Sequence, residues 1–331
     1  MNDRAVSLLE NYDFTVLRTY KGRGAILCET DRGLKIMKEY KAPAAKLALM
    51  DALLGNVKEM ALVDVDAPVA DREGNFICRD RDGISYVVKD YFEGRECSPR
   101  DTEDLRKCFR AMALLHTGLF YPREKTPEGL VRFDPEGEFA RQNALLRKIR
   151  KYLRERGNKT AFELALLGEY KRFEDLAEKT LTRLKQEDFT SFYEKVEREK
   201  SFIHGDCQYH NMLLEKDKMA VINFEKCRWD SPVGDLANFL RKVLEKCRWD
   251  PATGRILLDE YEAVNPLSDS GKRQLFYRLA YPEKFRKVAN SYYNSNKAFQ
   301  SQVYMEKLGQ ICLLEEDKEK FLRKIFHDMI E

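Results

Sequence analysis

Residues His204–Asn211 read HGDCQYHN, and the apolar stretch AVINFEKC follows at Ala220–Cys227. Phosphoryl transfer to a hydroxyl needs a carboxylate that orients or deprotonates the acceptor, and an oxygen ligand for the Mg²⁺ that neutralises the phosphates. Asp206, as the base, and Asn211, as the metal-side ligand, are five residues apart. One tight loop can therefore direct both side chains at the same polyphosphate.

Asn223 ends the strand expected after this loop and would bring a second polar side chain to the same place. Kinases normally carry Asp there, where it holds Mg²⁺ across the β- and γ-phosphates. The same sequence would also fit a polar loop in which Asp and Asn only form hydrogen bonds with the backbone of turns. The strand–turn–strand context favours the phosphoryl-transfer interpretation.

The composition limits the class of protein. At 331 residues the chain is long enough for two lobes with cores of their own, since domains typically run ~100–200 residues. Its 59 basic and 56 acidic residues give a net charge of +3, which offers no global electrostatic case for nucleic acid or a membrane surface. The eight cysteines form no CxxC pair, which favours reduced thiols in a cytoplasm.

The sequence shows no pattern typical of a signal peptide or a membrane span. The N-terminus lacks the charged-then-apolar pattern of a signal peptide, and no apolar run approaches the ~18 residues that span a bilayer. We therefore expect no membrane span and no secretion by a signal peptide.

Alternating apolar residues and turn signals predict a small antiparallel sheet with one helix in the N-terminal part. The expected helix begins at Pro43 and ends near Leu54. The expected strands are Phe14–Thr19, Ala25–Glu29, Leu34–Tyr40, Phe76–Arg79 and Ser85–Tyr91.

From Asp101 onward the pattern is largely helical, interrupted by the hairpin that follows the HGDCQYHN loop. We therefore predict an α+β fold with an N-lobe at residues 1–92, a hinge at 93–97 and a helical C-lobe at 98–331. The C-lobe would contain a catalytic-loop hairpin at 204–224. The hexapeptide EKCRWD occurs twice, at Glu225–Asp230 and Glu245–Asp250, which is not a solenoid period.

The HxDxxxxN loop with its hydrophobic hairpin resembles the aminoglycoside phosphotransferase and choline kinase group, relatives of the protein kinases. Three longer stretches resemble the CotS-type spore-coat proteins of endospore-forming bacteria. They are YFEGREC at Tyr91–Cys97, FEKCRWDSPVGDLANFLRKVLEK at Phe224–Lys246 and YPEKFRKVANSYYN at Tyr281–Asn294. The resemblance covers nearly the whole chain. It implies a bilobal protein-kinase-like fold and a role around spore-coat assembly, and it does not by itself imply turnover.

The resemblance also implies nucleotide-binding residues. Lys38 in LKIMKEY matches the lysine that contacts the nucleotide phosphates, whereas Lys35, three residues earlier, points to the opposite face of a strand. Asp90, Tyr91 and Phe92 would form the hinge segment that meets the adenine. The loop KGRG at 21–24 is a candidate phosphate cradle that an ordinary hairpin turn explains equally well.

Two residues are expected to support the catalytic loop. Asp235 matches a family position whose carboxylate braces the loop backbone, and it can also cap the following helix. His204 is interpreted as structural, anchoring the loop by hydrogen bonds. His116 fits a histidine whose hydrogen bonds are satisfied on a helix face.

Two departures from the kinase pattern weaken the expectation of catalysis. Asn223 keeps a carbonyl oxygen but loses the charge with which a carboxylate holds Mg²⁺. The helix glutamate that usually pairs with the strand lysine is missing between Pro43 and Gly55; Asp51 has a shorter reach, and Glu59 is expected beyond a break at Gly55. Kinase activity normally needs both contacts.

We therefore hypothesise a kinase-fold, catalytically impaired spore-coat protein that acts by binding. The alternative is an active phosphotransferase that uses ATP and Mg²⁺ on a small-molecule or protein hydroxyl. The expected ligands are ATP, with weakened Mg²⁺ binding at Asn211 and Asn223, and the expected partners are spore-coat proteins, not nucleic acid. The expected location is the mother-cell cytoplasm or the spore coat.

Overall fold

The computed structural model describes residues 3–22, 24–124, 127–216, 218–295 and 301–329. Its contacts group into two compact units. Unit 1 comprises Met1–Leu130, Glu199–Asp235 and Glu260–Asn265, and unit 2 comprises Val131–Arg198, Leu236–Asp259 and Pro266–Glu331. The expected boundaries at residues 92 and 97 divide the chain by type of element instead, and they remain a prediction.

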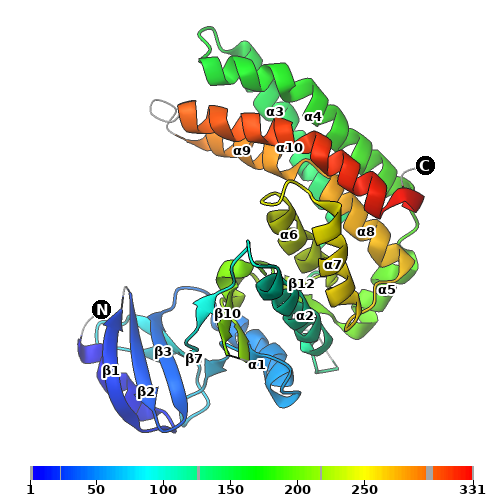
Figure 1. Ribbon diagram of the computed structural model, residues 1–331. Coiled ribbons are helices and arrows are strands. Elements are labelled where there is room, and N and C mark those ends of the chain that lie inside the picture. The colour runs from blue at the N-terminus through cyan, green and yellow to red at the C-terminus, as the bar shows by residue number, and fades with distance from the viewer. Residues whose placement is uncertain (1–2, 23, 125–126, 217, 296–300, 330–331) are drawn as a thin grey trace. The chain divides into compact units, whose positions relative to one another are not determined.

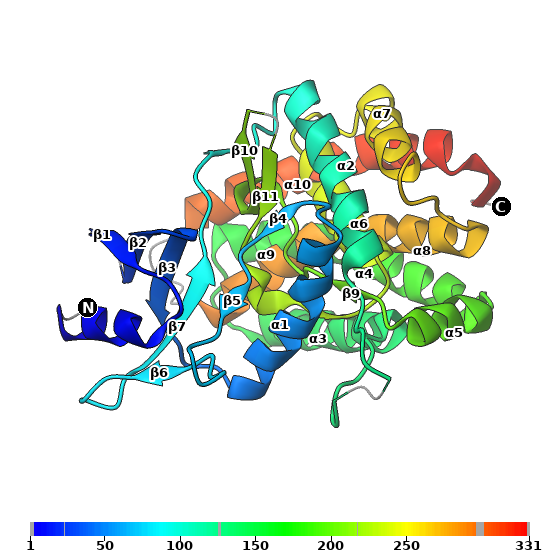
Figure 2. The ribbon, with the colours of Figure 1, turned by 90° about the horizontal axis from the view of Figure 1, so that it is seen from below.

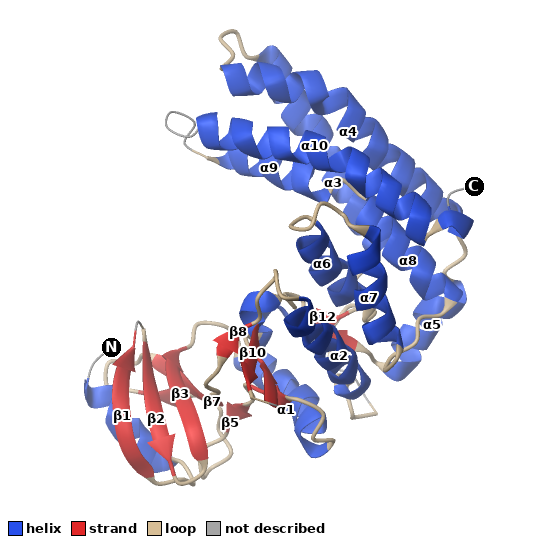
Figure 3. Ribbon diagram, viewed as in Figure 1, coloured by secondary structure: helices blue, strands red, loops and turns tan. Residues whose placement is uncertain are grey.

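An antiparallel sheet forms the N-terminal part of unit 1, as predicted (Figure 3). Its strand order is β1-β2-β3-β7-β5, with β6 beside β7. The bounds are β1 Val16–Gly22, β2 Ala25–Thr30, β3 Gly33–Glu39, β5 Pro68–Val69, β6 Cys78–Arg79 and β7 Ser85–Asp90. The sequence patterns found the longer strands, while the 3-10 helix η1 (Asp3–Asn11) and the two-residue strand β5 were not foreseen.

The two faces of this sheet have different neighbours. On one face, Met37 and Val88, which pair across β3 and β7, are buried in a core cluster with Leu9 and Tyr12. Because side chains alternate along a strand, Lys38 and Lys89 lie together on the other face. Sheet register therefore places the two lysines diagonally across β3 and β7 on one face, away from the apolar cluster.

Helix α1 (Ala44–Glu59) is longer than expected. It continues through Gly55, so the predicted break at that residue is wrong, and Glu59 belongs to the helix. A glycine inside a helix costs about 1 kcal/mol, but Leu54 and Val57 on either side of it are buried and hold the turn against the core. The side chain of Glu59 is exposed.

A second sheet joins the hairpin to the N-terminal segment within unit 1. Its order is β4-β11-β10-β8, with bounds β4 Asp64–Val65, β8 Arg95–Glu96, β10 Met212–Glu215 and β11 Lys218–Val221. In Figure 2, α1 lies beside β4 and β5, in agreement with their contacts. Gly94, with φ +147°, lets the chain pass the hairpin, since a Cβ there would lie 3.0 Å from the carbonyl oxygen of Leu214. Helix α2 (Thr102–Gly118) follows, capped by Asp101.

Strand β9 (Phe202–Ile203) pairs with β12 (Arg228–Trp229), and the catalytic-loop hairpin lies between them in sequence. Two short 3-10 helices, η2 (Tyr209–Asn211) and η3 (Phe224–Lys226), flank the hairpin strands. Asn211 is the last residue of η2, and Asn223 directly precedes η3 as its N-cap.

Unit 2 is helical. The long helices α3, α4, α9 and α10 run alongside one another (Figure 1), and aromatic rings fill their interfaces, for example Phe173 stacked on Phe285 at 4.3 Å. The helices that lie wholly or largely in this unit are α3 Pro135–Glu155, α4 Ala161–Gln186, α5 Thr190–Glu199, α6 Val233–Leu244, α7 Pro251–Glu262, α8 Asp269–Ala280, α9 Glu283–Asn294 and α10 Ser301–Ile325, followed by the short η4 His327–Met329. Within the described ranges, no helix is both long enough and apolar enough to cross a membrane.

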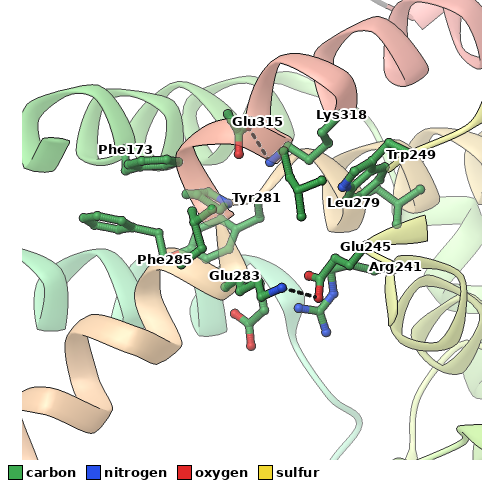
Figure 4. A pocket seen from close by; sticks show the side chains of 14 residues that line it. Phe173, Arg241, Glu245, Trp249, Leu279, Tyr281, Glu283, Phe285, Glu315 and Lys318 are labelled. Atoms are coloured by element: carbon green, nitrogen blue, oxygen red, sulfur yellow. Dashed lines mark ion pairs between the residues drawn. The ribbon is translucent and has the colours of Figure 1, made fainter. Parts of the chain in front are cut away.

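Unit 2 encloses a small cavity of about 30 Å³ (Figure 4). Aromatic side chains such as Trp249 and Phe173 line it together with two ion pairs, Lys318–Glu315 at 2.7 Å and Lys284–Glu245 at 3.1 Å. That volume holds about one or two water molecules. It is far too small for a nucleotide.

Candidate active site

His204 anchors the catalytic loop through both ring nitrogens. Its Nδ1 accepts a hydrogen bond from the backbone N–H of Asp206 at 3.1 Å, and its Nε2 donates to the carbonyl oxygen of Ile222 at 2.8 Å. The ring also packs against Phe224, with centroids 4.5 Å apart. The imidazole thus joins the loop to the strand end that carries Asn223, and neither nitrogen is left for a reacting group.

Asp235 lies beneath the loop with no exposed surface. Its carboxylate accepts from the backbone N–H groups of His204 at 2.7 Å and Gly205 at 2.9 Å, and from His116 Nε2 at 3.3 Å. The Nδ1 of His116 is 2.8 Å from the hydroxyl of Tyr261. Burial would raise the pKa of Asp235, but the hydrogen bonds and electrostatic attraction of His116 and His204 outweigh it, so the pKa lies below its ordinary value.

Gly205 is required by the close packing of this loop. Its φ is +80°, and a Cβ at this position would lie 2.1 Å from the carbonyl oxygen of Lys226. The backbone of η3 therefore passes directly over the loop, and only a residue without a side chain fits there.

Asn211 and Asn223 are bonded to each other. The Nδ2 of Asn211 donates to the carbonyl oxygen of Asp206 at 2.9 Å, and its Oδ1 accepts from Nδ2 of Asn223 at 2.9 Å. A backbone carbonyl can only accept, so it fixes Nδ2 of Asn211 toward Asp206 and leaves Oδ1 toward Asn223. Asn223 has a left-handed backbone (φ 70°, ψ 57°), which Asn and Asp tolerate better than most residues.

This arrangement does not fit a magnesium ion held by Asn211 and Asn223. An N–H group of Asn223 points at the oxygen that would have to share the metal with it. Magnesium in proteins is held by oxygens, usually with one or two carboxylates. Among the described residues, no group of three or more His, Cys, Asp or Glu side chains is arranged to hold a metal ion.

Asp206 has its carboxylate engaged by the chain itself. One oxygen accepts from Nε2 of Gln208 at 3.1 Å, and the other forms an ion pair with Nζ of Lys226 at 2.8 Å. The side chain of Asp206 is 25% exposed and that of Lys226 is 66% exposed, so solvent reaches this pair. Lys226 was not identified from the sequence, because nothing in EKC distinguishes it from a surface lysine.

A buried lysine, Lys89, lies on the other side of Asn223. Its Nζ is 3.3 Å from Asp66 and 3.1 Å from Glu225, and its side chain is 3% exposed. Asp66 also accepts the backbone N–H of Asn223 at 3.1 Å. Burial alone would lower the pKa of Lys89, but the two carboxylates outweigh that effect and raise the pKa above its ordinary value. Sequence analysis missed Lys89, although a lysine in the apolar strand SYVVKD was a signal.

Lys38 shares the sheet face of Lys89 and acts on the same carboxylate. Burial would raise the pKa of Glu225, but the charges of Lys89 and, more weakly, Lys38 lower it below its ordinary value. Lys46 on α1 donates a hydrogen bond to the backbone carbonyl of Glu225. No ion pair found in the described part of the chain joins Lys38 to Asp51.

Lys35 lies on the opposite face of β3 from Lys38 and forms a 3.0 Å ion pair with Asp90. Asp90 also pairs with Lys58 at 2.7 Å. The backbone N–H of Asp90 donates to Ala67, and that of Tyr91 donates to Leu34. The sheet therefore already uses two backbone donors of the expected hinge segment.

Phe92, the remaining residue of that segment, is half-buried. The candidate phosphate cradle at 21–24 contains Arg23, which lies outside the described residues. The described Gly24 has φ +68°, as a tight hairpin turn between β1 and β2 requires.

Comparisons with known proteins agree with the sequence resemblance. A family model described as "Spore coat putative kinase YutH" matches residues 141–325. Spore coat protein S of Bacillus subtilis (strain 168) is 24% identical over 325 residues, which cover 95% of this chain and 90% of that protein. The predicted relationship to spore-coat proteins is confirmed.

The fold is similar to that of solved kinases. An aminoglycoside phosphotransferase from Alicyclobacillus acidocaldarius matches with a TM-score of 0.81 at 19% identity, over 97% of this chain and 95% of that one. A choline kinase from Cryptosporidium parvum matches with a TM-score of 0.53 at 12% identity, over 98% and 97%. An amicoumacin kinase in complex with AMP-PNP and Ca²⁺ matches with a TM-score of 0.59 at 14% identity, over 96% and 94%. These likenesses confirm the predicted kinase-like α+β fold.

Proposed function

This chain belongs to the spore-coat family described as "Spore coat putative kinase YutH", and from that premise we propose that it is a catalytically impaired kinase-fold protein that acts by binding during coat assembly. Its location would be the spore coat or the mother-cell cytoplasm where the coat is built. Its partners would be other spore-coat proteins.

The hydrogen bond between Asn223 and Asn211 carries this proposal. In a phosphoryl-transfer site the two side chains would offer oxygens to a cation between them. Here an amide N–H takes the place of that cation, and the pair is satisfied without metal. Charge neutralisation of the phosphates, a main source of catalysis in such sites, would then be lost.

The ion pair of Asp206 with Lys226 supports the same proposal. The ammonium group of Lys226 and the amide of Gln208 occupy both carboxylate oxygens of Asp206, the group that would receive the proton of an acceptor hydroxyl. An acceptor hydroxyl would have to displace one of these contacts to reach the candidate base. An exposed lysine can move aside, however, so this contact alone would not abolish catalysis.

We propose that a nucleotide site is retained without its metal. Lys38 offers an ammonium group on the sheet face next to Glu225, and Phe92 follows the strand that ends at Asp90. Related folds hold such ligands, since the amicoumacin kinase was solved with AMP-PNP and Ca²⁺ and a spectinomycin phosphotransferase with ADP. The phosphates of ATP bound here would be held mainly by Lys38, because Lys89 is buried and paired with Asp66 and Glu225.

The alternative is an active ATP- and Mg²⁺-dependent phosphotransferase acting on a hydroxyl. The observation that favours it is the intact loop support, in which His204, Gly205 and Asp235 hold Asp206 in a defined position. A loop with no role in binding or chemistry would not need so many buried polar bonds. Catalysis would require magnesium to displace the bond between Asn211 and Asn223.

Thermal unfolding with ATP separates the two functions. A ligand that binds only the folded protein raises its Tm by an amount that grows with the ratio of ligand concentration to Kd. We expect ATP to raise the Tm equally with Mg²⁺ and with EDTA. A rise that appears only with Mg²⁺ would contradict the impaired site and favour the active enzyme. No rise in either condition would remove the nucleotide from the proposal.

A further inference from the structure

A second, larger cavity lies within unit 1, and none of the residues His204–Asn211 lines it. Its volume is about 590 Å³, and it is bordered by the end of α1, one face of α2 and the hairpin of β10 and β11. Its apolar lining includes Leu62, Leu114, Leu214 and Met219, of which Leu214 is buried and the others are half-buried. We call this cavity the hairpin groove.

Positive charge surrounds the hairpin groove. Of the described residues that line it, five are basic and one, Asp64, is acidic. The basic residues are Lys58, Lys107, Arg110, Lys216 and Lys218, and all are exposed.

Helix α2 supplies both charge and apolar surface to this groove. Lys107, Arg110 and Leu114 are spaced at i, i+3 and i+7, so they lie along one face of the helix. Lys58 is paired with Asp90. For the other four cations, the described part of the chain offers no carboxylate within ion-pair distance.

Unit 2 provides a contrasting groove of nearly the same size, about 560 Å³, lined by the basic run of α3. There Arg147 pairs with Glu178, Arg150 with Glu174 and Lys151 with Glu155. Four acidic residues balance four basic ones. Among the described residues, ion pairs thus engage three of the four cations in the groove of unit 2 but only Lys58 among the five of the hairpin groove.

This difference cannot come from overall composition, because the whole chain has a net charge of only +3. The described lining of the hairpin groove therefore carries a local excess of positive charge. An apolar floor with an uncompensated basic rim is complementary to an acidic segment that carries apolar side chains.

We propose that the hairpin groove docks an acidic segment of a partner protein, with its apolar side chains on the floor and its carboxylates against the rim. The apolar contacts supply most of the affinity, and the charges select the partner and speed the encounter. The inference deepens the proposed function and rests on it only for the source of the partner, a spore-coat protein. None of the groove residues belongs to the candidate nucleotide site.

Binding of labelled model peptides tests this inference. The probe is a short fluorescein-labelled peptide that repeats Glu-Glu-Leu, compared with repeats of Lys-Lys-Leu and Glu-Glu-Ser. Fluorescence anisotropy should show that the first binds at least about tenfold more tightly than the other two. Equal binding of Glu-Glu-Ser would overturn the role of the apolar floor, and tighter binding of a DNA oligonucleotide would overturn the choice of a protein partner.

Charge reversal locates the site. Lys107→Glu with Arg110→Glu should weaken Glu-Glu-Leu binding about tenfold or more, and Lys216→Glu, at the exposed hairpin turn, should weaken it independently. Arg147→Glu, in the neutralised groove of unit 2, is the matched control and should leave the affinity unchanged. Unchanged binding in both groove variants would refute the inference.

The same variants distinguish peptide binding at the hairpin groove from nucleotide binding at the candidate active site. Each should retain the wild-type Tm shift with ATP, because its substitution lies outside the nucleotide site. A variant that loses peptide binding and keeps the ATP shift supports the groove. Failure of the peptide experiment with an unchanged ATP shift would reject the groove alone.

Discussion

The side-chain amide of Asn223 donates a 2.9 Å hydrogen bond to the side-chain oxygen of Asn211. The carbonyl of Asp206 fixes the orientation of this bond, because Asn211 must direct its own amide nitrogen to that carbonyl. A carboxylate at position 223 would place an oxygen against an oxygen. The loop would then need a cation to hold it together.

Asn223→Asp should therefore make the protein depend on a divalent cation. In EDTA the variant loses the amide bond and gains a repulsive contact, and we expect a loss of about 1–3 kcal/mol in unfolding free energy. Mg²⁺ should restore most of it by binding between the introduced carboxylate and Asn211. Urea unfolding with and without Mg²⁺ measures both effects. The backbone is not a confounding factor, because Asp tolerates the left-handed conformation as Asn does.

The wild-type protein is the control for that experiment, and its unfolding free energy should barely respond to Mg²⁺. If the wild type were stabilised by Mg²⁺ as strongly as Asn223→Asp, the amide bond would not be the reason for weak metal binding. If Mg²⁺ did not change the unfolding free energy of Asn223→Asp, other groups would also prevent the metal from binding.

A second prediction compares Gly205, which is crowded by backbone, with Gly168, which has open space around it. Gly205→Ala places a methyl group 2.1 Å from the carbonyl of Lys226 at φ +80°, and we expect a loss of more than about 2 kcal/mol. Gly168→Ala, within α4 and with open space around the added methyl, should stabilise by about 0.5–1 kcal/mol. Urea unfolding of both variants measures these two changes in unfolding free energy. Equal effects would mean that η3 yields easily to a side chain at Gly205.

Much of the fold could be predicted because its patterns are local. Alternation and turn residues identify β1, β2, β3 and β7, and the HGDCQYHN loop followed by an apolar hairpin identifies the candidate site. Context overrides local sequence elsewhere. The hexapeptide EKCRWD forms a 3-10 turn and strand β12 at Glu225–Asp230, but a turn with positive φ at Arg248 and Trp249 in its second copy.

The contact between Lys89 and Asp66 could not be predicted for a physical reason. It depends on the register of β7 against β3 and on the two-residue strands β4 and β5 that flank Asp66. Strands so short leave no periodicity in a sequence. The break predicted at Gly55 failed likewise, since helix propensity is a weak guide where neighbouring residues are buried.

Lys89→Met tests the weight of that buried contact. The substitution preserves most of the side-chain volume and leaves the Asp66 carboxylate buried without its cation, so we expect a loss of about 3–5 kcal/mol in urea unfolding. Adding Asp66→Asn should recover a large part of it, because the neutral amide still accepts the N–H of Asn223. Lys226→Met, which breaks the exposed pair with Asp206, is the matched control and should cost less than about 1 kcal/mol. Similar losses at Lys89 and Lys226 would argue against a special role for burial.

Asp235 makes the stability of the catalytic loop depend on pH. Its pKa is lower in the folded protein than in the unfolded chain, so its contribution is complete above the ordinary value of about 3.9 and is lost as the pH falls through the folded pKa. Asp235→Asn turns an amide N–H toward a site that receives N–H groups from His204, Gly205 and His116, and we expect a loss of about 2–4 kcal/mol at neutral pH. Urea unfolding of both proteins should give a difference that is constant above about pH 5 and shrinks below about pH 4. A difference that stays the same down to acid pH would show that the carboxylate is not the ionised brace of the loop.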